Sequence, residues 1–285
     1  MKFVTQRSGK LIDFLAKELS NSSKSKVKKL IKEGIVYLDG EKVLQTNTMI
    51  SEGQTVEINK NGKQPSKSVA EKAKSLPYKI LLEDDSIIAI EKTAGVNTTS
   101  STKDKNTIYN HLKSYLNGQS ITLVNYIGRQ VSGVLLFYKG DTLPSNLQKE
   151  QIEIKYCALV EGLLQEETGT VSNYLKISEG GKVHEASEET GQLATTNFRT
   201  LKKYAKHQLL EIEKPTHIKG QIRVHLSNLN CPVVGDKKYG ATKNPFNRIA
   251  LHLFSLNFKH PATNEEVKLT YPTPNEFILY GRGRS

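Results

Sequence analysis

The sequence predicts an α+β protein of two parts, a small helical unit followed by a larger unit built on a mostly antiparallel β-sheet. Two helical patterns and a hairpin pattern fall within residues 10–60, whereas strand patterns dominate from residue 78 and rarely alternate with helices. At 285 residues the chain also exceeds one average domain. We therefore expect separate domains at residues 1–60 and 78–285.

The small unit is predicted to fold as helix, helix and small sheet. Apolar residues recur at helical spacing in residues 10–19. A second helix should begin after Ser22 or Ser23, which are good N-caps, and end at Gly34. The Asp39–Gly40 pair then predicts a tight hairpin turn, with one more strand after it.

The composition changes twice beyond this unit. Residues 61–77 contain Pro, Lys and Ser but few large apolar side chains, which is typical of a linker. Further along, the patterns indicate flanking helices and strands of a mixed sheet. Helical patterns occupy 107–116 and 218–229, and strand patterns occupy 78–84, 86–92, 132–139, 154–162, 196–204, 207–214 and 266–272.

The charge balance favours a polyanionic partner. The chain has 41 Lys and Arg against 29 Asp and Glu, a formal net charge of +12. Nucleic acid is the most common polyanion that such a protein meets, although a generally positive surface kept for solubility is the plain alternative.

The second helix concentrates this charge. Opposite its apolar face the helix carries five lysines, which are Lys24, Lys26, Lys28, Lys29 and Lys32. Glu33 is the one acidic residue of the helix. Lysines beside the N-terminus of a helix can bind phosphates, which favours contact with RNA or DNA over a merely solvated face.

The remaining composition excludes several classes of site. Cys157 and Cys231 stand alone in apolar segments, so we expect no zinc site, no other metal site and no disulfide framework. No apolar run approaches the length of a membrane span, and the charged N-terminus does not resemble a secretory signal. We expect a soluble, cytoplasmic protein.

Residues 10–58 resemble the S4 RNA-binding domain. The resemblance rests on the basic Ser/Lys start of the second helix, its Ile-Lys-Glu-Gly end and the Asp-Gly hairpin. It implies that this unit binds structured RNA.

The larger unit resembles RluA-type pseudouridine synthases. The matching stretches are ILLEDDSIIAIEKTAGV, IKYCALVEG, GQIRVHLSNLNCPVVGDKKYG and RIALHLFSLNFKHP, in the family's order. The resemblance implies a fold for residues 78–285 and a chemistry, the isomerisation of uridine in RNA without metal or cofactor. It also implies that Tyr156 packs on the base and that Arg223 pairs with a catalytic Asp.

The segment VNYIGRQVSGVLLF, at residues 124–137, departs from this family at the decisive position. Gly128 occupies the place of the catalytic Asp, which the family needs as an ionisable oxygen. Asn125 and Tyr126 replace the family's His and Arg, whereas Arg129 is retained. The family's Thr-Gly-Arg-x-His-Gln-Ile-Arg motif reads Thr-His-Ile-Lys-Gly-Gln-Ile-Arg at residues 216–223.

These departures set two expectations for the cleft. Arg223, deprived of its carboxylate, should be an unpaired cation that needs solvent, another carboxylate or an RNA phosphate. Arg129 and Lys219 are expected to contact RNA. From the residues alone, Tyr156 could equally be a core aromatic, and Arg223 with His225 a surface pair on a helix.

Three functions follow as hypotheses. The leading one is an RNA-binding homologue of RluA-type enzymes, with ribosomal RNA as partner, that has lost isomerase activity. The alternative is an active synthase with a substitute acid, for which Glu185, Glu188 and Glu189 lie in a polar, loop-like segment and Asp141 lies too far along the strand. A protein–protein scaffold with incidental charge is the third.

Overall fold

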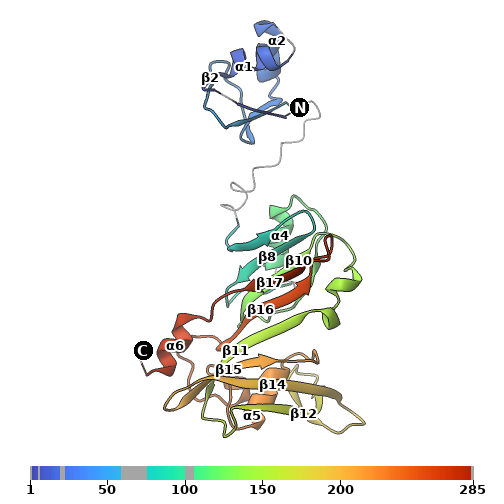
Figure 1. Ribbon diagram of the computed structural model, residues 1–285, viewed down its shortest axis with the longest axis vertical. Helices are drawn as coiled ribbons and strands as arrows, with labels where there is room; N and C mark the ends of the chain where they lie inside the picture. Colours follow the sequence, from blue (N-terminus) through green and yellow to red (C-terminus); the bar gives the residue numbers. More distant parts are fainter. Residues whose placement is uncertain (1, 6, 20–22, 59–75, 100–105, 284–285) are drawn as a thin grey trace. The chain divides into compact units, whose positions relative to one another are not determined.

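The computed structural model describes residues 2–5, 7–19, 23–58, 76–99 and 106–283 (Figure 1). The chain divides into two compact units, residues 1–77 and 78–285, and each is described here by itself. The linker predicted at residues 61–77 lies outside the described residues, except for Leu76 and Pro77.

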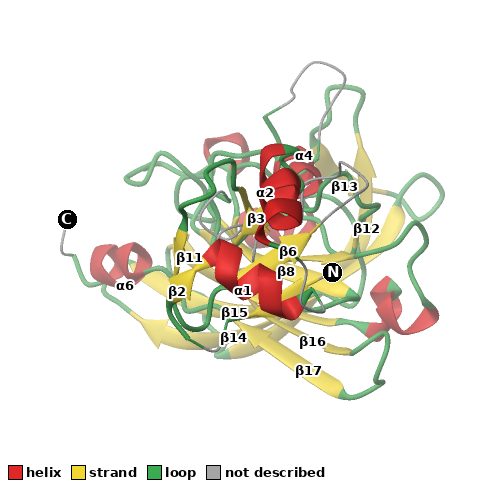
Figure 2. Ribbon diagram, turned by 90° about the horizontal axis from the view of Figure 1, so that it is seen from above, coloured by secondary structure: helices red, strands yellow, loops and turns green. Residues whose placement is uncertain are grey.

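Among its described residues, the first unit has two helices beside a small sheet, and the helices contact each other (Figure 2). Its sheet has the strand order β1-β6-β3-β4, and β2 pairs separately with β5. The elements are β1 (Lys2–Val4), β2 (Gly9–Lys10), α1 (Leu11–Glu18), α2 (Lys24–Lys32), β3 (Val36–Leu38), β4 (Glu41–Lys42), β5 (Met49–Ile50) and β6 (Thr55–Ile58).

Local sequence explains the boundaries of these elements. The Ser23 hydroxyl accepts a hydrogen bond from the Lys26 amide at 3.3 Å and so caps α2, as predicted. Asp39 and Gly40 both have positive φ angles and join β3 to β4, which confirms the predicted hairpin. The apolar faces of both helices meet the strands in one core that includes Leu11, Leu15, Val27 and Ile31.

The second unit is built on one long twisted sheet (Figure 1) with the strand order β13-β12-β14-β15-β11-β16-β10-β8-β7. Within it β10 and β16 run parallel, and every other paired neighbour runs antiparallel. The predicted α+β class is therefore confirmed. Its strands are β7 (Ile80–Glu83), β8 (Ile87–Lys92), β9 (Thr122–Leu123), β10 (Ser132–Tyr138), β11 (Glu153–Glu161), β12 (Thr168–Ile177), β13 (Val183–Ala186), β14 (Gln192–Lys203), β15 (His207–Glu213), β16 (Leu251–Lys259) and β17 (Glu266–Thr270).

Four of these strands, β9, β12, β13 and β16, were not among the predicted ones. The side chains of β12 are mostly exposed or half-buried, so its apolar signal is weak. Those of β16 are buried on both faces of the sheet and therefore do not alternate. The segment that includes Glu185 was expected to be loop-like, which is wrong for residues 183–186 because they pair with β12 as β13.

In the part of this unit that the structure describes, the helices are α4 (Ile108–Tyr115), α5 (Gln221–Asn228) and α6 (Asn275–Gly281), of which α5 contacts β14 and α6 contacts β15. The prediction that a helix begins at residue 218 is wrong by three residues. Gly220 precedes α5 with a φ of +76°, a left-handed conformation that glycine adopts without strain. Residues 216–219 are consequently a loop. In the described part of the chain, no helix is long and apolar enough to cross a membrane.

Candidate nucleotide pocket

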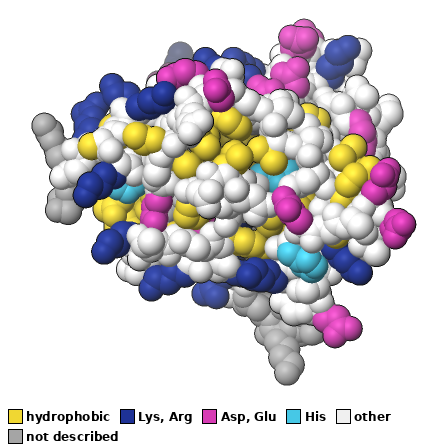
Figure 3. Space-filling view, turned by 90° about the horizontal axis from the view of Figure 1, so that it is seen from below, with side chains coloured by type: hydrophobic (Ala, Val, Ile, Leu, Met, Phe, Trp, Pro, Cys, Tyr) yellow, Lys and Arg dark blue, Asp and Glu magenta, His cyan; other side chains and the backbone are white. Residues whose placement is uncertain are grey.

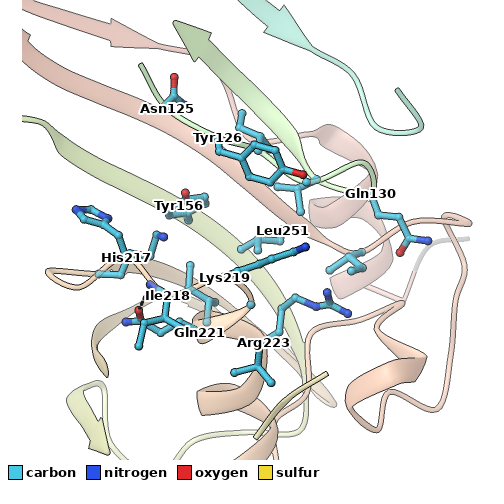
Figure 4. Close-up of a pocket in the computed structure, with 18 of the residues that line it drawn as sticks. Asn125, Tyr126, Gln130, Tyr156, His217, Ile218, Lys219, Gln221, Arg223 and Leu251 are labelled. Carbon is cyan, nitrogen blue, oxygen red and sulfur yellow. Dashed lines mark hydrogen bonds between the residues drawn. The ribbon is translucent and has the colours of Figure 1, made fainter. Parts of the chain in front are cut away.

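A pocket of about 500 Å³ lies in the second unit (Figure 4). Its walls come from the turn before β10, the 3-10 segment Lys149–Gln151, strand β11, the start of β13, the loop and start of α5, the 3-10 segment Lys237–Tyr239 and the start of β16, together with Asn97. These segments are far apart in the sequence, so the tertiary fold alone brings them together. Gly128, Tyr156, Arg129, Lys219 and Arg223, which the sequence singled out, all line this one pocket.

Buried hydrogen bonds fix the turn that carries Gly128. The side chain of Asn125 accepts a hydrogen bond from the Leu136 amide at 2.8 Å and donates one to the Val134 carbonyl at 3.0 Å. The Thr98 hydroxyl donates to the Ile127 carbonyl at 2.6 Å. Asn125 therefore ties the turn to β10, a structural role that the sequence comparison did not suggest.

Lys92 supports the same turn from behind. Its ammonium group is fully buried and donates to the carbonyls of Thr93, Arg129 and Val131 at 3.0, 3.3 and 2.8 Å. Burial, together with the nearby charge of Arg248, lowers the pKa of Lys92 to about 7. A lysine at the end of β8 thus holds the turn in place, and sequence reasoning had not identified it.

Gly128 itself leaves an open space. A Cβ atom added to it would meet no atom within 4 Å, and its φ lies outside the left-handed range. Both the backbone and the pocket could accept a side chain at this position. The pocket thus has room for a carboxylate at this position, and it lacks one only because the residue is glycine.

Tyr156 fits both interpretations drawn from the sequence. It lies on β11, is only 6% exposed and also lines the pocket. The ammonium group of Lys214 lies 5.8 Å from the centre of its ring, a cation–π arrangement. Burial raises the pKa of the Tyr156 hydroxyl, so this group remains protonated at neutral pH.

Arg223 is not the unpaired cation that the sequence predicted. Its Nε and Nη2 atoms donate to Oδ2 and Oδ1 of Asp236 at 2.5 and 2.6 Å, and its guanidinium group stacks on Tyr239 at 4.7 Å. Asp236 is 1% exposed. Of the three outcomes expected for Arg223, the structure shows pairing with another carboxylate, in the bidentate geometry that arginine favours.

Asp236 is positioned by the residue before it. Gly235 has a φ of +86°, and a Cβ atom there would lie 2.0 Å from the Arg248 carbonyl oxygen, so no other residue fits. The chain turns at Gly235 and directs the carboxylate toward α5. Gly235 and Asp236 belong to the matching stretch at residues 220–240, but that resemblance did not identify Asp236 as the partner of Arg223.

The pocket is lined by cations and, among its described lining residues, by no Asp or Glu. The six cations are Arg129, Lys149, Lys214, Lys219, Arg223 and Lys238. Burial and the nearby charge of Lys149 lower the pKa of Lys214 to about 8. Burial and the charges of Lys214 and Lys149 also lower the pKa of His217. The pocket therefore carries positive charge that its own walls do not neutralise.

Sequence reasoning missed half of these cations. Lys149 and Lys214 belong to segments without a matching motif, whereas Lys238 lies in the matching stretch at residues 220–240 but was not assigned to the site. Only the fold places all three on one pocket. A basic residue at the end of a buried strand, as Lys214 is after β15, was the one signal available.

The proposed substitute acids lie elsewhere. Glu185 accepts hydrogen bonds from the side-chain amides of Asn173 and Asn228, and Glu188 accepts one from the Tyr174 hydroxyl at 2.8 Å. Neither these residues nor Glu189 and Asp141 are among those that line the pocket. In the described part of the chain, no group of three or more His, Cys, Asp or Glu could hold a metal ion.

His225 is not a surface residue, so its interpretation as half of a surface pair with Arg223 is wrong. Its ring is fully buried, with Nδ1 2.8 Å from the Thr196 hydroxyl and Nε2 2.8 Å from Oδ1 of Asn173. Gln221, which the sequence did not assign to the site, donates to the Thr195 carbonyl at 2.6 Å. Together they fasten α5 to the sheet.

The lysines of α2 form a second basic surface, in the first unit. Lys24 pairs with Asp13 of α1 at 2.6 Å, and Lys29 lies 3.9 Å from Glu33. Asp13 is an acidic neighbour that sequence reasoning missed because it belongs to the other helix. Lys26, Lys28 and Lys32 are exposed, and no described carboxylate lies within 4.0 Å of their ammonium groups.

Charge is unevenly spread over the molecule. On the face shown in Figure 3, Lys and Arg side chains are most numerous along the left and lower rim, and Asp and Glu side chains lie mainly along the upper and right rim. Such a distribution suits binding of an extended polyanion along one side.

Comparison with known proteins agrees with this architecture. Residues 86–228 match the model of the RNA pseudouridylate synthase family, and residues 10–56 match the S4 domain. An uncharacterized RNA pseudouridine synthase of Aquifex aeolicus is 28% identical, over 94% of this chain and 91% of its own. Ribosomal large subunit pseudouridine synthase D of Pasteurella multocida is 25% identical, over 96% and 91%. The structure of human RNA pseudouridylate synthase domain containing 4 superposes with a TM-score of 0.60 at 23% identity, over 73% of this chain and 94% of that one.

Proposed function

Since the chain belongs to the RNA pseudouridylate synthase family and carries an S4 domain, we propose that it binds structured ribosomal RNA without isomerising uridine. The proposal has two parts, an RNA-binding function and a silent active site. Each depends on different residues and is tested separately.

One observation carries the silent active site: among the described residues that line the pocket, none is an Asp or Glu. Cleaving the bond between the base and the ribose needs a carboxylate as nucleophile or base in this family. The ionisable groups of the pocket are amines, guanidinium groups, phenols and the His217 imidazole. Gly128, at the position that the resemblance assigns to the acid, offers no side chain.

The RNA-binding function is supported by the S4 domain and by two basic surfaces. Lys26, Lys28 and Lys32 of α2 are exposed, and six cations line the pocket. Ribosomal RNA is the partner we favour because relatives of this chain are named ribosomal large subunit pseudouridine synthases. Binding of this kind should weaken steeply as salt is raised.

An active enzyme with a substitute acid is the alternative. The contacts of Glu185 and Glu188 with Asn173, Asn228 and Tyr174 disfavour it, because they engage these carboxylates outside the pocket. A protein–protein scaffold is the third possibility, and it predicts no salt-dependent affinity for RNA.

The test of silence is release of tritium from RNA labelled at C5 of uridine, since substitution at C5 expels that hydrogen. Large-subunit ribosomal RNA transcribed with the label is incubated with the purified chain, and the Pasteurella multocida enzyme named above serves as positive control. We expect no release above buffer from this chain. Release that rises with its concentration would refute the silent site and favour a substitute acid.

The test of RNA binding is a gel-shift titration of the same RNA at increasing salt. We expect the logarithm of the affinity to fall linearly with the logarithm of the salt concentration. An affinity that ignores salt, or no shift at all, would favour the scaffold.

A further inference from the structure

We propose that Arg248 is a positioning residue for the pocket: it fixes the turn that carries Gly128 relative to the start of β16, without entering the pocket itself. Its effect on RNA rests on the proposed function, which is RNA binding by this chain. Arg248 lies in the loop before β16 and is not among the residues that line the pocket. Any effect that it has on the pocket must therefore pass through other residues.

Arg248 contacts two walls of the pocket. Its Nη2 atom donates a hydrogen bond to the Ser132 hydroxyl at 2.6 Å. Ser132 is the first residue of β10, and the four residues before it, 128–131, all line the pocket. Nε and Nη2 of Arg248 also donate to the carbonyls of Ile249 and Leu251, at 3.3 and 3.4 Å, and both of these residues line the pocket. One side chain thus ties the turn before β10 to the start of β16.

His252 fixes the direction of these hydrogen bonds. Its Nδ1 atom lies 2.7 Å from the Ser132 hydroxyl, and its Nε2 atom lies 3.2 Å from the Tyr271 carbonyl. Because a carbonyl only accepts, Nε2 carries the hydrogen and Nδ1 accepts the hydrogen of Ser132. Burial, together with the charge of Arg248, lowers the pKa of His252 to about 4, which keeps the ring neutral at pH 7. The Ser132 oxygen is therefore the acceptor for Arg248.

The backbone leaves little room for Ser132 to shift along β10. The next residue, Gly133, pairs with Leu253, and a Cβ atom on Gly133 would lie 2.2 Å from the Leu253 carbonyl oxygen. Strands β10 and β16 therefore approach each other closely at this point. On the other side of Ser132, the Val131 carbonyl accepts a hydrogen bond from Lys92 at 2.8 Å. A change at Ser132 is consequently transmitted to the turn before it, because the strand after it cannot adjust.

Helix α6 holds the Arg248 side chain in place. Nη1 of Arg248 lies 3.5 Å from Oε1 of Glu276, and its guanidinium carbon lies 5.0 Å from the centre of the Phe277 ring, which is fully buried. Arg248 and the buried Lys92 repel each other, and the Glu276 carboxylate offsets part of that repulsion. Each nitrogen of the guanidinium group thus has a partner, as expected of a group that positions other residues instead of binding RNA.

Nuclear magnetic resonance of the full chain, labelled at its glycine nitrogens, tests this proposal because the turn contains Gly128. The Gly128 amide signal is assigned by its loss in Gly128→Ala, since a Cβ atom there meets nothing within 4 Å. Ser132→Ala removes only the hydroxyl oxygen, and Arg248→Met removes the guanidinium group. Lys139→Met is the matched control, because Lys139 is also a mostly buried cation, 2.9 Å from a Glu83 oxygen, and does not line the pocket.

We expect Ser132→Ala and Arg248→Met to shift the Gly128 signal in the same direction by more than its linewidth, and Lys139→Met to leave it in place. In gel shifts with the ribosomal RNA, the first two variants should bind about 2- to 30-fold more weakly than the wild-type chain, the range for residues that act through a network of contacts. Their salt slope should equal that of the wild-type chain, because neither residue contacts a phosphate. The double variant should lose less than the product of the two single losses, since both remove the same bond.

An unmoved Gly128 signal in Ser132→Ala, or an equal shift in Lys139→Met, would overturn the positioning role, and Ser132→Ala decides the matter if Arg248→Met does not fold. A salt slope reduced by about one unit in Arg248→Met would show a direct phosphate contact and would overturn it as well. If the wild-type chain binds no RNA, the proposed function fails, while the Gly128 signal still decides whether Arg248 positions the turn.

Discussion

Breaking the buried ion pair between Arg223 and Asp236 should destabilise the larger unit asymmetrically. Asp236 is 1% exposed, whereas the Arg223 side chain is 24% exposed and borders the pocket. Arg223→Met leaves the buried Asp236 carboxylate without its partner, whereas Asp236→Asn leaves the Arg223 guanidinium group, which is exposed enough to contact water. The two substitutions therefore remove the same interaction but leave different groups without a partner.

The magnitude follows from what each variant leaves behind. Removing one partner of a buried pair costs about 3–5 kcal/mol, so we expect Arg223→Met to lose about 3 kcal/mol of unfolding free energy, the lower end because the site borders the pocket. Asp236→Asn should lose about 1.5–2 kcal/mol, the lower part of the range for a hydrogen bond to a charged group. Combining both changes buries no charge, so the double variant should be more stable than Arg223→Met alone.

Urea unfolding followed by circular dichroism measures these differences, because the chain contains no tryptophan. Because the chain divides into two compact units, the comparison is restricted to the unfolding transition that both single variants shift. The reasoning is refuted if Asp236→Asn is as damaging as Arg223→Met, or if the double variant loses the sum of the two.

Three further predictions follow from other residues. Lys92→Met should reduce the pH dependence of the unfolding free energy. The pKa of Lys92 is about 7 in the folded chain and 10.5 as its usual value, so between these pH values the unfolded chain binds more protons, and the wild-type protein should gain up to about 1.4 kcal/mol of unfolding free energy per pH unit as the pH rises. Urea unfolding on both sides of pH 7 measures this gain, and an equal gain in the variant would contradict the prediction. Gly128→Asp should change the unfolding free energy by no more than about 0.5 kcal/mol relative to the wild-type chain, because a Cβ atom there meets nothing within 4 Å. The variant should still release no tritium, because the loop at residues 216–220 lacks the family's Arg and His. Release of tritium would show that the rest of the cleft can support isomerisation. Replacing three exposed lysines of α2 by Ala should weaken RNA binding and reduce the salt slope by about 2–3 units, whereas replacing three exposed lysines of the larger unit should not, and equal effects in gel shifts would remove α2 from the RNA interface. The α2 set is Lys26, Lys28 and Lys32, and the control set is Lys176, Lys259 and Lys268.

Sequence predicted those parts of the fold whose causes are local. Ser23, Gly34 and the Asp39–Gly40 turn fix the first unit through caps and backbone conformation, which neighbours in the sequence dictate. Strand β16 was missed because burial on both faces removes alternation, and β12 because exposure weakens its apolar pattern. The start of α5 was misplaced because apolar spacing does not reveal the backbone angle of Gly220.

The candidate site was predictable only where it resembles a motif. Gly128, Tyr156 and Arg223 were identified in this way, and all three line one pocket. The partner of Arg223 was not, since Asp236 meets it through the turn at Gly235 and not through helical spacing. The structural roles of Lys92 and Asn125 were missed because their bonds are to backbone carbonyls and amides, which no side-chain pattern records.

These same buried bonds bear on what the pocket is for. Lys92, Asn125 and Asp236 are each buried and each bonded to groups across the fold. A buried polar group without a partner costs about 1–3 kcal/mol, so these contacts hold one arrangement of the walls against alternatives. Closure of the pocket would break these bonds and leave buried polar groups without partners, at that cost in free energy. The pocket that Gly128 lines instead keeps an open space among six cations, which agrees with the RNA binding that we propose.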